Sequence, residues 1–372
     1  MSTANAAEAA RLDAYSAPGR PVVVVDPDPR RRDTLVRAVS PMFRVTEYPD
    51  IDAAVARTRG APAAVLLGEG LSVPGRQQPI RRLRGEPGFS RSPVVQCYFG
   101  VAPGGGDTSP DAVVDCRLST ARLADTIIML IDKSVEAAWD TLPEKPRNAL
   151  RQTLTSFRSF AGLVEADSQL SYGDVTAACA PVIEVVRASG PKDLFEGLRS
   201  HNDLWYVHSV RVSTLLALFG HTIGASDDEV MTLATGGLVH DFGKMTMPAE
   251  VARKVGPLSP EETIKAHRHV DATVTYLERR SDVPRGVVAI AAQHHERIDG
   301  SGYPRGLKGD ELDDLARMAA IVDVFAALTE RRSYRASMSP FQALEVMQET
   351  IREQLDQRLV RLFRDMLLKA VA

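Results

Sequence analysis

The stretch HHERIDGSGYP occupies residues 294–304 and combines two adjacent histidines, two acids and a loop punctuated by glycine and proline. The apolar run over 287–292 before it is typical of a buried helix, which would carry His294 and His295 at its C-terminal end. Consecutive residues on a helix point about 100° apart. The two imidazoles therefore suit a metal cluster, or one metal and its substrate, better than a single ion bound from one side. The competing interpretation is a surface loop with two solvated histidines.

Further histidines and acids interrupt helices that are otherwise apolar. They are His208 in the helix expected over 206–219, His240-Asp241 at the end of the run over 230–239, His267 and His269 on the next helix, and Asp323 in the run over 317–328. Burying an unpaired Asp beside a His is costly unless something compensates the charge. A metal does so, because it favours the carboxylate and the neutral imidazole. Each residue alone is explained by an interior histidine or a salt bridge between helices; together they predict a metal site.

Length and composition limit the other possibilities. A chain of 372 residues with 44% hydrophobic and 25% charged residues is typical of a globular protein with two domains and a connector. The net charge of −3 argues against general binding of nucleic acid or of anionic membranes. The three scattered cysteines show no metal-ligand spacing. We expect residues 1–19 to be a flexible leader and not a signal peptide, no membrane partner, and a cytoplasmic protein.

Short apolar runs alternate with helical patterns in the first third of the chain. We expect strands over 21–26, 43–48, 63–67, 93–98 and 112–116, and helices over 31–39, 51–59 and 121–133. This alternation predicts a doubly wound α/β sheet. Its order and size over residues 20–134 resemble the receiver domain of bacterial response regulators.

The chemistry of the receiver family is missing from this region. That family has a phosphoryl-accepting Asp at the end of the third strand, where this chain has Gly68. Asp26 and Asp28 flank the acidic position after the first strand, while Tyr98 and Arg117 stand where the family has a hydroxyl residue and a Lys. No aspartyl phosphate can form at Gly68. We therefore interpret the region as a pseudo-receiver without a phosphoacceptor, used for binding a protein partner or for self-association; unconventional signalling is the alternative.

The rest of the chain has helical periodicity only. Apolar positions recur at helical spacing over 135–192, with a break near 171–173, which predicts a helical connector or the start of the second domain. From residue 193 to residue 372 we expect an all-α domain.

The polar residues of this all-α part resemble the HD-GYP domain, a branch of the HD phosphohydrolase superfamily, over about residues 195–353. The resemblance is carried by His208, His240-Asp241, His294-His295-Glu296, Asp299-Gly300-Ser301-Gly302-Tyr303-Pro304 and Asp323. It implies a metal-dependent phosphodiesterase that opens cyclic di-GMP to linear pGpG, by hydroxide that the metals activate, and leaves further hydrolysis to GMP open. It also implies the metal ligands His208, His240, Asp241, His269, His294, His295 and Asp323, with Asp241 bridging two ions and His267 as the alternative to His269.

The resemblance also implies contacts with the substrate. Lys244 is expected to contact a phosphate oxygen and to act with Asp241 in catalysis, and Tyr303 to pack against guanine or to hydrogen-bond the substrate. Asp299 and Gly302 belong to the same loop, and Arg332 and Arg335 stand at positions that are basic in the family. Local cations of this kind suit a dianionic ligand.

Departures from the family pattern concern the metals and the substrate. Leu204 stands where some members have a Glu that supports a third metal, so we expect two divalent ions and no organic cofactor. Imidazole and carboxylate ligands suit iron, manganese or zinc, and the resemblance favours iron or manganese. Two alternatives stay open: a non-catalytic cyclic di-GMP sensor, and a phosphodiesterase for another cyclic dinucleotide.

Overall fold

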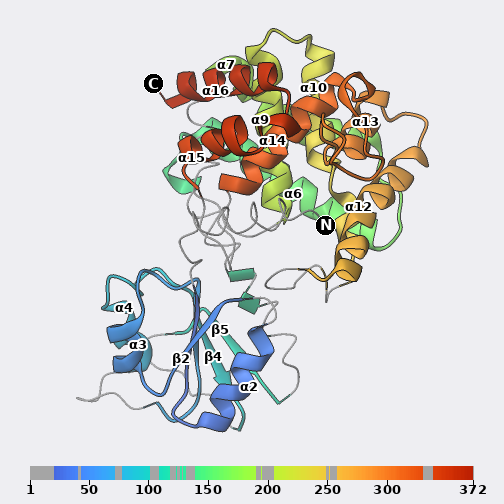
Figure 1. Cartoon of the computed structure of the whole chain (residues 1–372). Helices are drawn as coiled ribbons and strands as arrows, with labels where there is room; N and C mark the ends of the chain where they lie inside the picture. The colour runs from blue at the N-terminus through green and yellow to red at the C-terminus, as the bar shows by residue number, and fades with distance from the viewer. Residues whose placement is uncertain are drawn as a thin grey trace.

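The structure is a computed structural model (Figure 1). It describes residues 21–40, 43–71, 78–100, 109–117, 139–189, 205–248, 258–329 and 338–371, together with the single residues 123, 126, 127, 129, 130, 194 and 251. The expected leader over 1–19 and most of the helix expected over 121–133 lie outside the described residues.

The first part of the chain is a parallel sheet of five strands in the order β2-β1-β3-β4-β5. The strands are β1 (Val22–Val25), β2 (Val45–Tyr48), β3 (Ala64–Leu67), β4 (Val94–Tyr98) and β5 (Ala112–Asp115). The order reverses at β1, which has β2 on one side and β3 on the other. This is the topology of a doubly wound, receiver-like sheet. The predicted fold class is confirmed.

Alternating residues of β1 build a core on each face of the sheet. Val22 and Val24 pack in one cluster with Leu35 of α2 (Pro29–Val39). Val23 and Val25 pack in another, which contains residues of α3 (Ile51–Arg57) and α4 (Pro79–Arg84). Figure 1 shows α2 on one side of the strands and α3 and α4 on the other. A strand that is covered on both faces must be apolar throughout, which explains the run of four valines.

An internal arginine neutralises the acid at the carboxyl end of β1. Asp26 is fully buried, and Arg31 of α2 donates hydrogen bonds from Nη2 to Oδ1 at 2.9 Å and from Nε to Oδ2 at 3.0 Å. Arg31 Nη2 also donates to the backbone oxygen of Glu69 at 3.0 Å. A Cβ atom at Gly68 would lie only 1.8 Å from Asp26 Oδ2. The position of the missing phosphoacceptor is therefore filled by a neighbouring carboxylate that is already paired.

The described residues from 139 onward form helices and short helical turns, and no strand. The helices are α6 (Glu144–Glu165), α7 (Tyr172–Ser189), α9 (Trp205–Thr222), α10 (Asp227–Val239), α12 (Pro260–Glu278), α13 (Arg285–Gln293), α14 (Asp314–Thr329), α15 (Pro340–Glu345) and α16 (Gln357–Val371). The turns are η2 (Trp139–Thr141), η3 (Phe242–Thr246), η4 (Gly309–Glu311), η5 (Val346–Thr350) and η6 (Arg352–Gln354). The prediction of a helical second half is confirmed.

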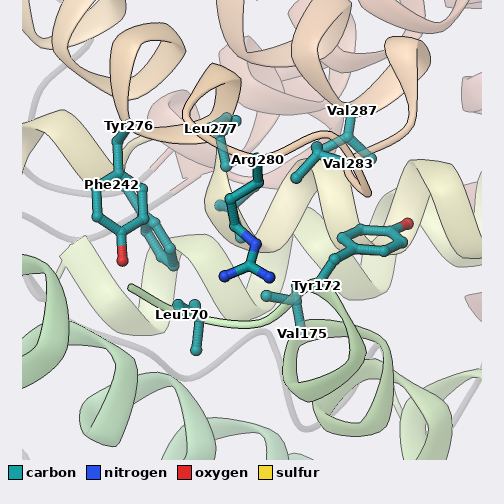
Figure 2. Close-up of a pocket in the computed structure, with 10 residues that line it drawn as sticks. Leu170, Tyr172, Val175, Phe242, Tyr276, Leu277, Arg280, Val283 and Val287 are labelled. Carbon is teal, nitrogen blue, oxygen red and sulfur yellow. The ribbon is translucent and has the colours of Figure 1, made fainter. Parts of the chain in front are cut away.

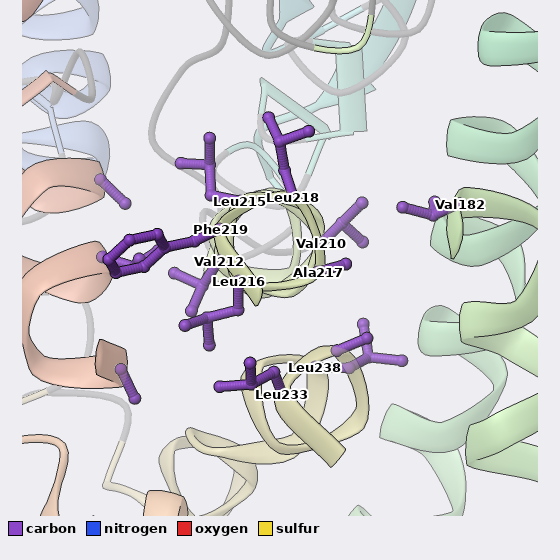
Figure 3. Packing of buried hydrophobic residues seen from close by; sticks show 14 of the residues in the cluster. Val182, Val210, Val212, Leu215, Leu216, Ala217, Leu218, Phe219, Leu233 and Leu238 are labelled. Carbon is purple, nitrogen blue, oxygen red and sulfur yellow. The ribbon is translucent and has the colours of Figure 1, made fainter. Parts of the chain in front are cut away.

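Helix α9 lies at the centre of this helical part. Figure 3 looks along α9 and shows apolar side chains pointing outward on all sides, among them Val210, Leu216 and Phe219. A helix that is apolar all round is buried all round. Val182 of α7 and Phe157 of α6 belong to the same hydrophobic core. Helices from the expected connector thus pack directly with later ones, and the domain bounds at 134–135 and 192–193 stay predictions.

Glycines and caps place the end of α10 beside α9. A Cβ at Gly237 would come within 2.9 Å of the backbone of Ser213, so the two helices pack in close contact. Ser226 and Glu229 form a capping box that starts α10, and Ser259 and Glu262 form one that starts α12. The two capping boxes fix where α10 and α12 begin, and Gly237 brings the C-terminal part of α10 against α9. No helix among the described residues has the length and apolar character needed to cross a membrane.

Restoring the missing aspartate should not restore a receiver. We expect Gly68→Asp to destabilise the protein by about 1–3 kcal/mol, because the new side chain collides with Asp26. We also expect no phosphoaspartate after incubation with acetyl phosphate. Thermal unfolding and mass spectrometry measure the two effects.

The matched control is Gly162→Asp on α6, where an added Cβ meets no atom within 4 Å. A Gly68→Asp protein that is as stable as this control and accepts the phosphoryl group would contradict the interpretation.

Candidate metal centre

Seven histidine and aspartate side chains from separate elements converge in the helical part. Two groups could each hold a metal ion, and the potential ligand atoms within each group lie within 4.8 Å of one another. One group is Asp241, His269, His294 and His295, and the other is His208, His240 and Asp323. These are the seven residues that the sequence resemblance implied as ligands. His267, the alternative to His269, belongs to neither group.

Asp241 is the carboxylate that connects the two groups. Its Oδ1 lies 3.2 Å from Nε2 of His269 and 3.7 Å from Nε2 of His294. Its Oδ2 lies 3.1 Å from Nε2 of His240, a member of the other group. Asp241 therefore faces both groups, as a bridging ligand must.

Asp323 is the carboxylate of the second group. Its Oδ1 lies 3.0 Å from Nε2 of His208 and 4.0 Å from Nε2 of His240. Its Oδ2 lies 3.6 Å from Nδ1 of His295. The lone acid on the apolar helix α14 is thus surrounded by imidazoles from α9, from the end of α10 and from the end of α13.

Backbone carbonyls fix the tautomer of three of the histidines. The Nδ1 atoms of His240, His269 and His294 donate to the carbonyl oxygens of Gly237 at 2.8 Å, Ala266 at 2.7 Å and Ala291 at 3.0 Å. A carbonyl can only accept, so each Nδ1 carries a proton, and in the neutral form of the ring the lone pair of Nε2 faces the centre of the site. A hydrogen bond from the second ring nitrogen to a backbone carbonyl is typical of histidines that bind metals.

The atoms that point into the centre lack other partners. Nε2 of His240, His269 and His294 and Oδ1 of Asp241 are buried and have no hydrogen-bond partner among the residues that the structure describes. Buried polar atoms without partners are rare and costly. Metal coordination would satisfy all four, and the imidazole and carboxylate donors without cysteine suit a first-row transition metal. The side chains present therefore fit a binuclear metal site.

The protonation states also fit metal binding. Burial lowers the pKa of His294 to about 4 and lowers the pKa of His295 well below its usual range. Burial acts to raise the pKa of Asp241, but the nearby His240 and Lys244 outweigh it and hold that pKa well below the ordinary value. Burial likewise acts to raise the pKa of Asp323, but its hydrogen bond with His208 and the neighbouring histidines outweigh burial and hold that pKa well below the ordinary value. Neutral imidazoles and ionised carboxylates are the forms that coordinate metals.

A close backbone contact positions Asp241. A Cβ at Gly243 would lie 2.0 Å from the carbonyl oxygen of His269, so only glycine lets the turn η3 approach α12 this closely. Thr273 bridges the contact, because its hydroxyl accepts from the Gly243 N–H and donates to the His269 oxygen, both at 2.8 Å. The residue types at 243 and 273 thus set the spacing between Asp241 and His269.

The loop after His295 is held by a buried glutamate. Glu296 is fully buried and accepts hydrogen bonds from the N–H groups of Arg305 at 2.7 Å and Leu307 at 3.0 Å. A Cβ at Gly302 would lie 2.5 Å from the backbone oxygen of His295, so the loop folds tightly onto the end of α13. Glu296 and Gly302 shape the loop.

Tyr303 stacks between two imidazoles. Its ring lies parallel to His267, with centroids 3.5 Å apart and an interplanar angle of 7°, and on His295 at 4.7 Å and 29°. The sequence prediction allowed Tyr303 to pack against guanine or to hydrogen-bond the substrate. With both ring faces covered, the structure leaves the second option open.

The remaining predicted contacts are only partly described. Lys244 Nζ pairs with Asp241 Oδ2 at 2.5 Å, at the metal site. Asp299 accepts from the Ser301 N–H at 2.9 Å and so closes a turn within the loop. Leu204, Arg332 and Arg335 lie outside the described residues.

Two cavities lie close to the site without containing any of the seven residues. One, of about 20 Å³, is lined by Val239 and Phe242, which flank His240-Asp241, and by residues of α7 and α12 (Figure 2). It has room for about one water molecule. The other, of about 220 Å³, is lined by Gly243, Thr246 and Arg279 among others. The first is too small for a nucleotide, and neither is lined by the clustered histidines.

Three residues that contact the site had no predicted role. Thr273 was not among the predicted site residues, Glu296 entered only as part of the motif, and His267 only as an alternative ligand. Their partners are backbone groups or rings on other elements, which no local pattern indicates. The acid at 296 next to the paired histidines was the one available signal.

Comparisons with known proteins agree with this geometry. Residues 194–359 match the HD domain family model. The chain is 32% identical over 188 residues to the cyclic di-GMP phosphodiesterase PA4108 of Pseudomonas aeruginosa, covering 49% of this chain and 45% of that protein. It is 38% identical over 147 residues to the 3'3'-cGAMP-specific phosphodiesterase 1 of Vibrio cholerae, covering 39% of this chain and 34% of that protein. The chain thus spans less than half the length of either relative.

A solved structure shares the fold. Bd1817, described as an HDG"Y"P protein from Bdellovibrio bacteriovorus, superposes with a TM-score of 0.52 at 18% identity and covers 66% of this chain and 80% of its own. At this identity the likeness concerns the fold alone. Over residues 194–359 the chain matches the HD domain family and is related to the HD-GYP cyclic di-GMP phosphodiesterases, and the parallel α/β region before this stretch resembles a receiver.

Proposed function

We propose that this protein hydrolyses a cyclic dinucleotide, cyclic di-GMP in the first place, at a site with two metal ions. The observation that carries the proposal is the set of four buried, unpartnered ligand atoms on His240, Asp241, His269 and His294. A site built only for stability would leave these atoms unexplained. The product is linear pGpG, and further hydrolysis to GMP is left to experiment.

The metal ions would be held by the two groups of side chains. Asp241, His269, His294 and His295 would bind one ion and His208, His240 and Asp323 the other, with Asp241 reaching both. Such a pair lowers the pKa of a water and stabilises charge on phosphate oxygens. Iron or manganese fits the donor set and the family resemblance.

The chain's own residues would bind and orient the phosphodiester. The side chain of Lys244 is 30% exposed, and its ammonium group forms an ion pair with Asp241. It can therefore turn to a phosphate oxygen of the substrate. Asp241 keeps a negative charge at the site because its pKa is held low. Tyr303 offers its hydroxyl edge rather than a ring face. In this proposal Lys244 binds the phosphate and Tyr303 positions the ligand.

A second substrate has specific support. One relative is named as a phosphodiesterase for 3'3'-cGAMP, and it matches at 38% identity. Both ring faces of Tyr303 are covered by imidazoles, so this residue offers no stacking surface with which to sense a nucleobase. The two candidate substrates differ in one base only.

Regulation is proposed to come through the receiver-like region without phosphorylation. Gly68 has no carboxylate that could accept a phosphoryl group, and the neighbouring Asp26 is already paired with Arg31. Binding of a protein partner or of a second copy is the remaining route for a signal.

The first prediction from the proposed function concerns Asp241. We expect Asp241→Asn to lower turnover of cyclic di-GMP at least about a hundredfold and to reduce the bound metal, because it removes the charge that both groups share. Chromatography of the nucleotides and elemental analysis of anaerobically purified protein measure the two effects. Asp228→Asn, at the exposed start of α10, the helix that leads to His240-Asp241, is the matched control.

Circular dichroism must show the Asp241→Asn protein folded. Full turnover by that folded variant would refute the proposed chemistry. Wild-type protein that is loaded with metal and binds cyclic di-GMP without cleaving it would instead support a sensor.

A second prediction separates phosphate binding from metal binding. We expect Lys244→Gln to reduce kcat/KM about a hundredfold while the metal content stays unchanged, because a cation at the phosphate is lost and no ligand is removed. Lys369→Gln on α16 is the control. Loss of metal in the Lys244 variant would show a structural role instead.

The third prediction concerns substrate choice. We expect cyclic di-GMP and 3'3'-cGAMP to be hydrolysed with kcat/KM values within about tenfold of each other, a difference of about 1.4 kcal/mol, because Tyr303 has no free ring face with which to sense the changed base. A competition assay with both nucleotides measures the ratio. Exclusive cleavage of 3'3'-cGAMP would overturn the choice of cyclic di-GMP as first substrate.

A further inference from the structure

His267 makes a close contact that the proposed chemistry has not used. Its ring lies flat on Tyr303, at 3.5 Å between centroids and 7° between planes. His267 belongs to neither group of potential metal ligands, although it is two residues from His269 on α12. The stack therefore joins α12 to the loop that follows α13.

The stack restricts Tyr303 from both sides. His295 covers the second face of the ring at 4.7 Å, and His269 approaches its edge with centroids 6.5 Å apart. A phenol ring held between two other rings cannot swing out of its plane without breaking a contact. Only its rotation within that plane and its hydroxyl edge remain available.

The hydroxyl of Tyr303 is available to a ligand. It has no hydrogen-bond partner among the residues that the structure describes. A phenol hydroxyl is protonated at neutral pH, so it can act as a hydrogen-bond donor. A protonated hydroxyl beside a metal site is suited to donate to a phosphate oxygen.

We propose that His267 is a positioning residue that clamps Tyr303 against His295, so that the tyrosine hydroxyl is already aimed at a phosphate oxygen of the cyclic dinucleotide. The inference rests on the proposed function for its ligand. His295 alone would leave one face of the ring open, and the loop's other described anchors, such as the bonds to Glu296, hold its backbone and not this ring. His267 covers the other face of the Tyr303 ring.

Three variants test the clamp in the metal-loaded chain of residues 1–372. We expect His267→Ala to lower kcat for cyclic di-GMP about three- to tenfold with unchanged metal content, because an aromatic pair contributes about that factor. His267→Phe keeps a flat ring and should stay within about twofold of wild type. In a Tyr303→Phe background, which lacks the hydroxyl, His267→Ala should have no further effect.

A second measurement does not depend on activity. In metal-free protein with ¹³C-labelled tyrosine, the Tyr303 ring signal is identified by its loss in Tyr303→Phe. We expect the signal to move toward that of solvent-exposed tyrosines in His267→Ala, and to stay shifted by ring currents in His267→Phe. His221→Ala, at the exposed end of α9, is the control for removal of a histidine.

Several outcomes would overturn the clamp. Effects of His267→Ala and Tyr303→Phe that multiply would show that His267 does not act through Tyr303, and a His267→Phe protein as slow as His267→Ala would show that the ring is not what matters. A lower KM in His267→Ala would make His267 a competitor for the base. If wild type cleaves no cyclic dinucleotide, the proposed function fails, while an unmoved tyrosine signal in His267→Ala refutes the clamp itself.

Discussion

The helical half of the molecule depends on a buried carboxylate among imidazoles. Asp241 is 1% exposed and lies within 4 Å of nitrogen atoms from four histidines and Lys244. Such a charge is tolerable in a protein interior only if it is paired. The apolar helices around it, with α9 at their centre, supply the rigidity that keeps those partners in place. Stability requires that the charge of Asp241 be compensated, whereas the proposed chemistry requires that the carboxylate stay ionised. A bound metal pair would meet both requirements.

The elements and the cluster of candidate ligands could be predicted from the sequence for a specific reason. Acids and histidines on apolar helices, such as Asp323, are rare enough to stand out, and each strand of the sheet is an apolar run between turn residues. Local patterns of this kind can be read directly from the sequence. The family resemblance then chose His269 over His267, a choice that helical periodicity alone could not make, and the structure places His269 in the cluster.

Contacts between distant elements could not be predicted in the same way. The pair of Arg31 with Asp26 depends on where α2 crosses the end of β1, and the stack of His267 on Tyr303 depends on how a loop folds back on α12. Neither has a spacing that a sequence pattern records. The absence of a phosphoacceptor at Gly68 was visible, but the physical reason was not: Asp26 fills the space that its side chain would need.

The two halves of the chain treat buried acids in opposite ways. In the sheet, Asp26 is neutralised from within by Arg31, whose bidentate hydrogen bonds leave no requirement for an external cation. In the helical part, Asp241 faces imidazole nitrogens, and its Oδ1 has no hydrogen-bond partner among the described residues. A cation that is built in makes a site inert, whereas a set of unpartnered ligands makes a site that requires an ion. This difference explains why only the second half of the chain is expected to carry the chemistry, and why the receiver-like sheet can serve as a scaffold without metal or phosphate.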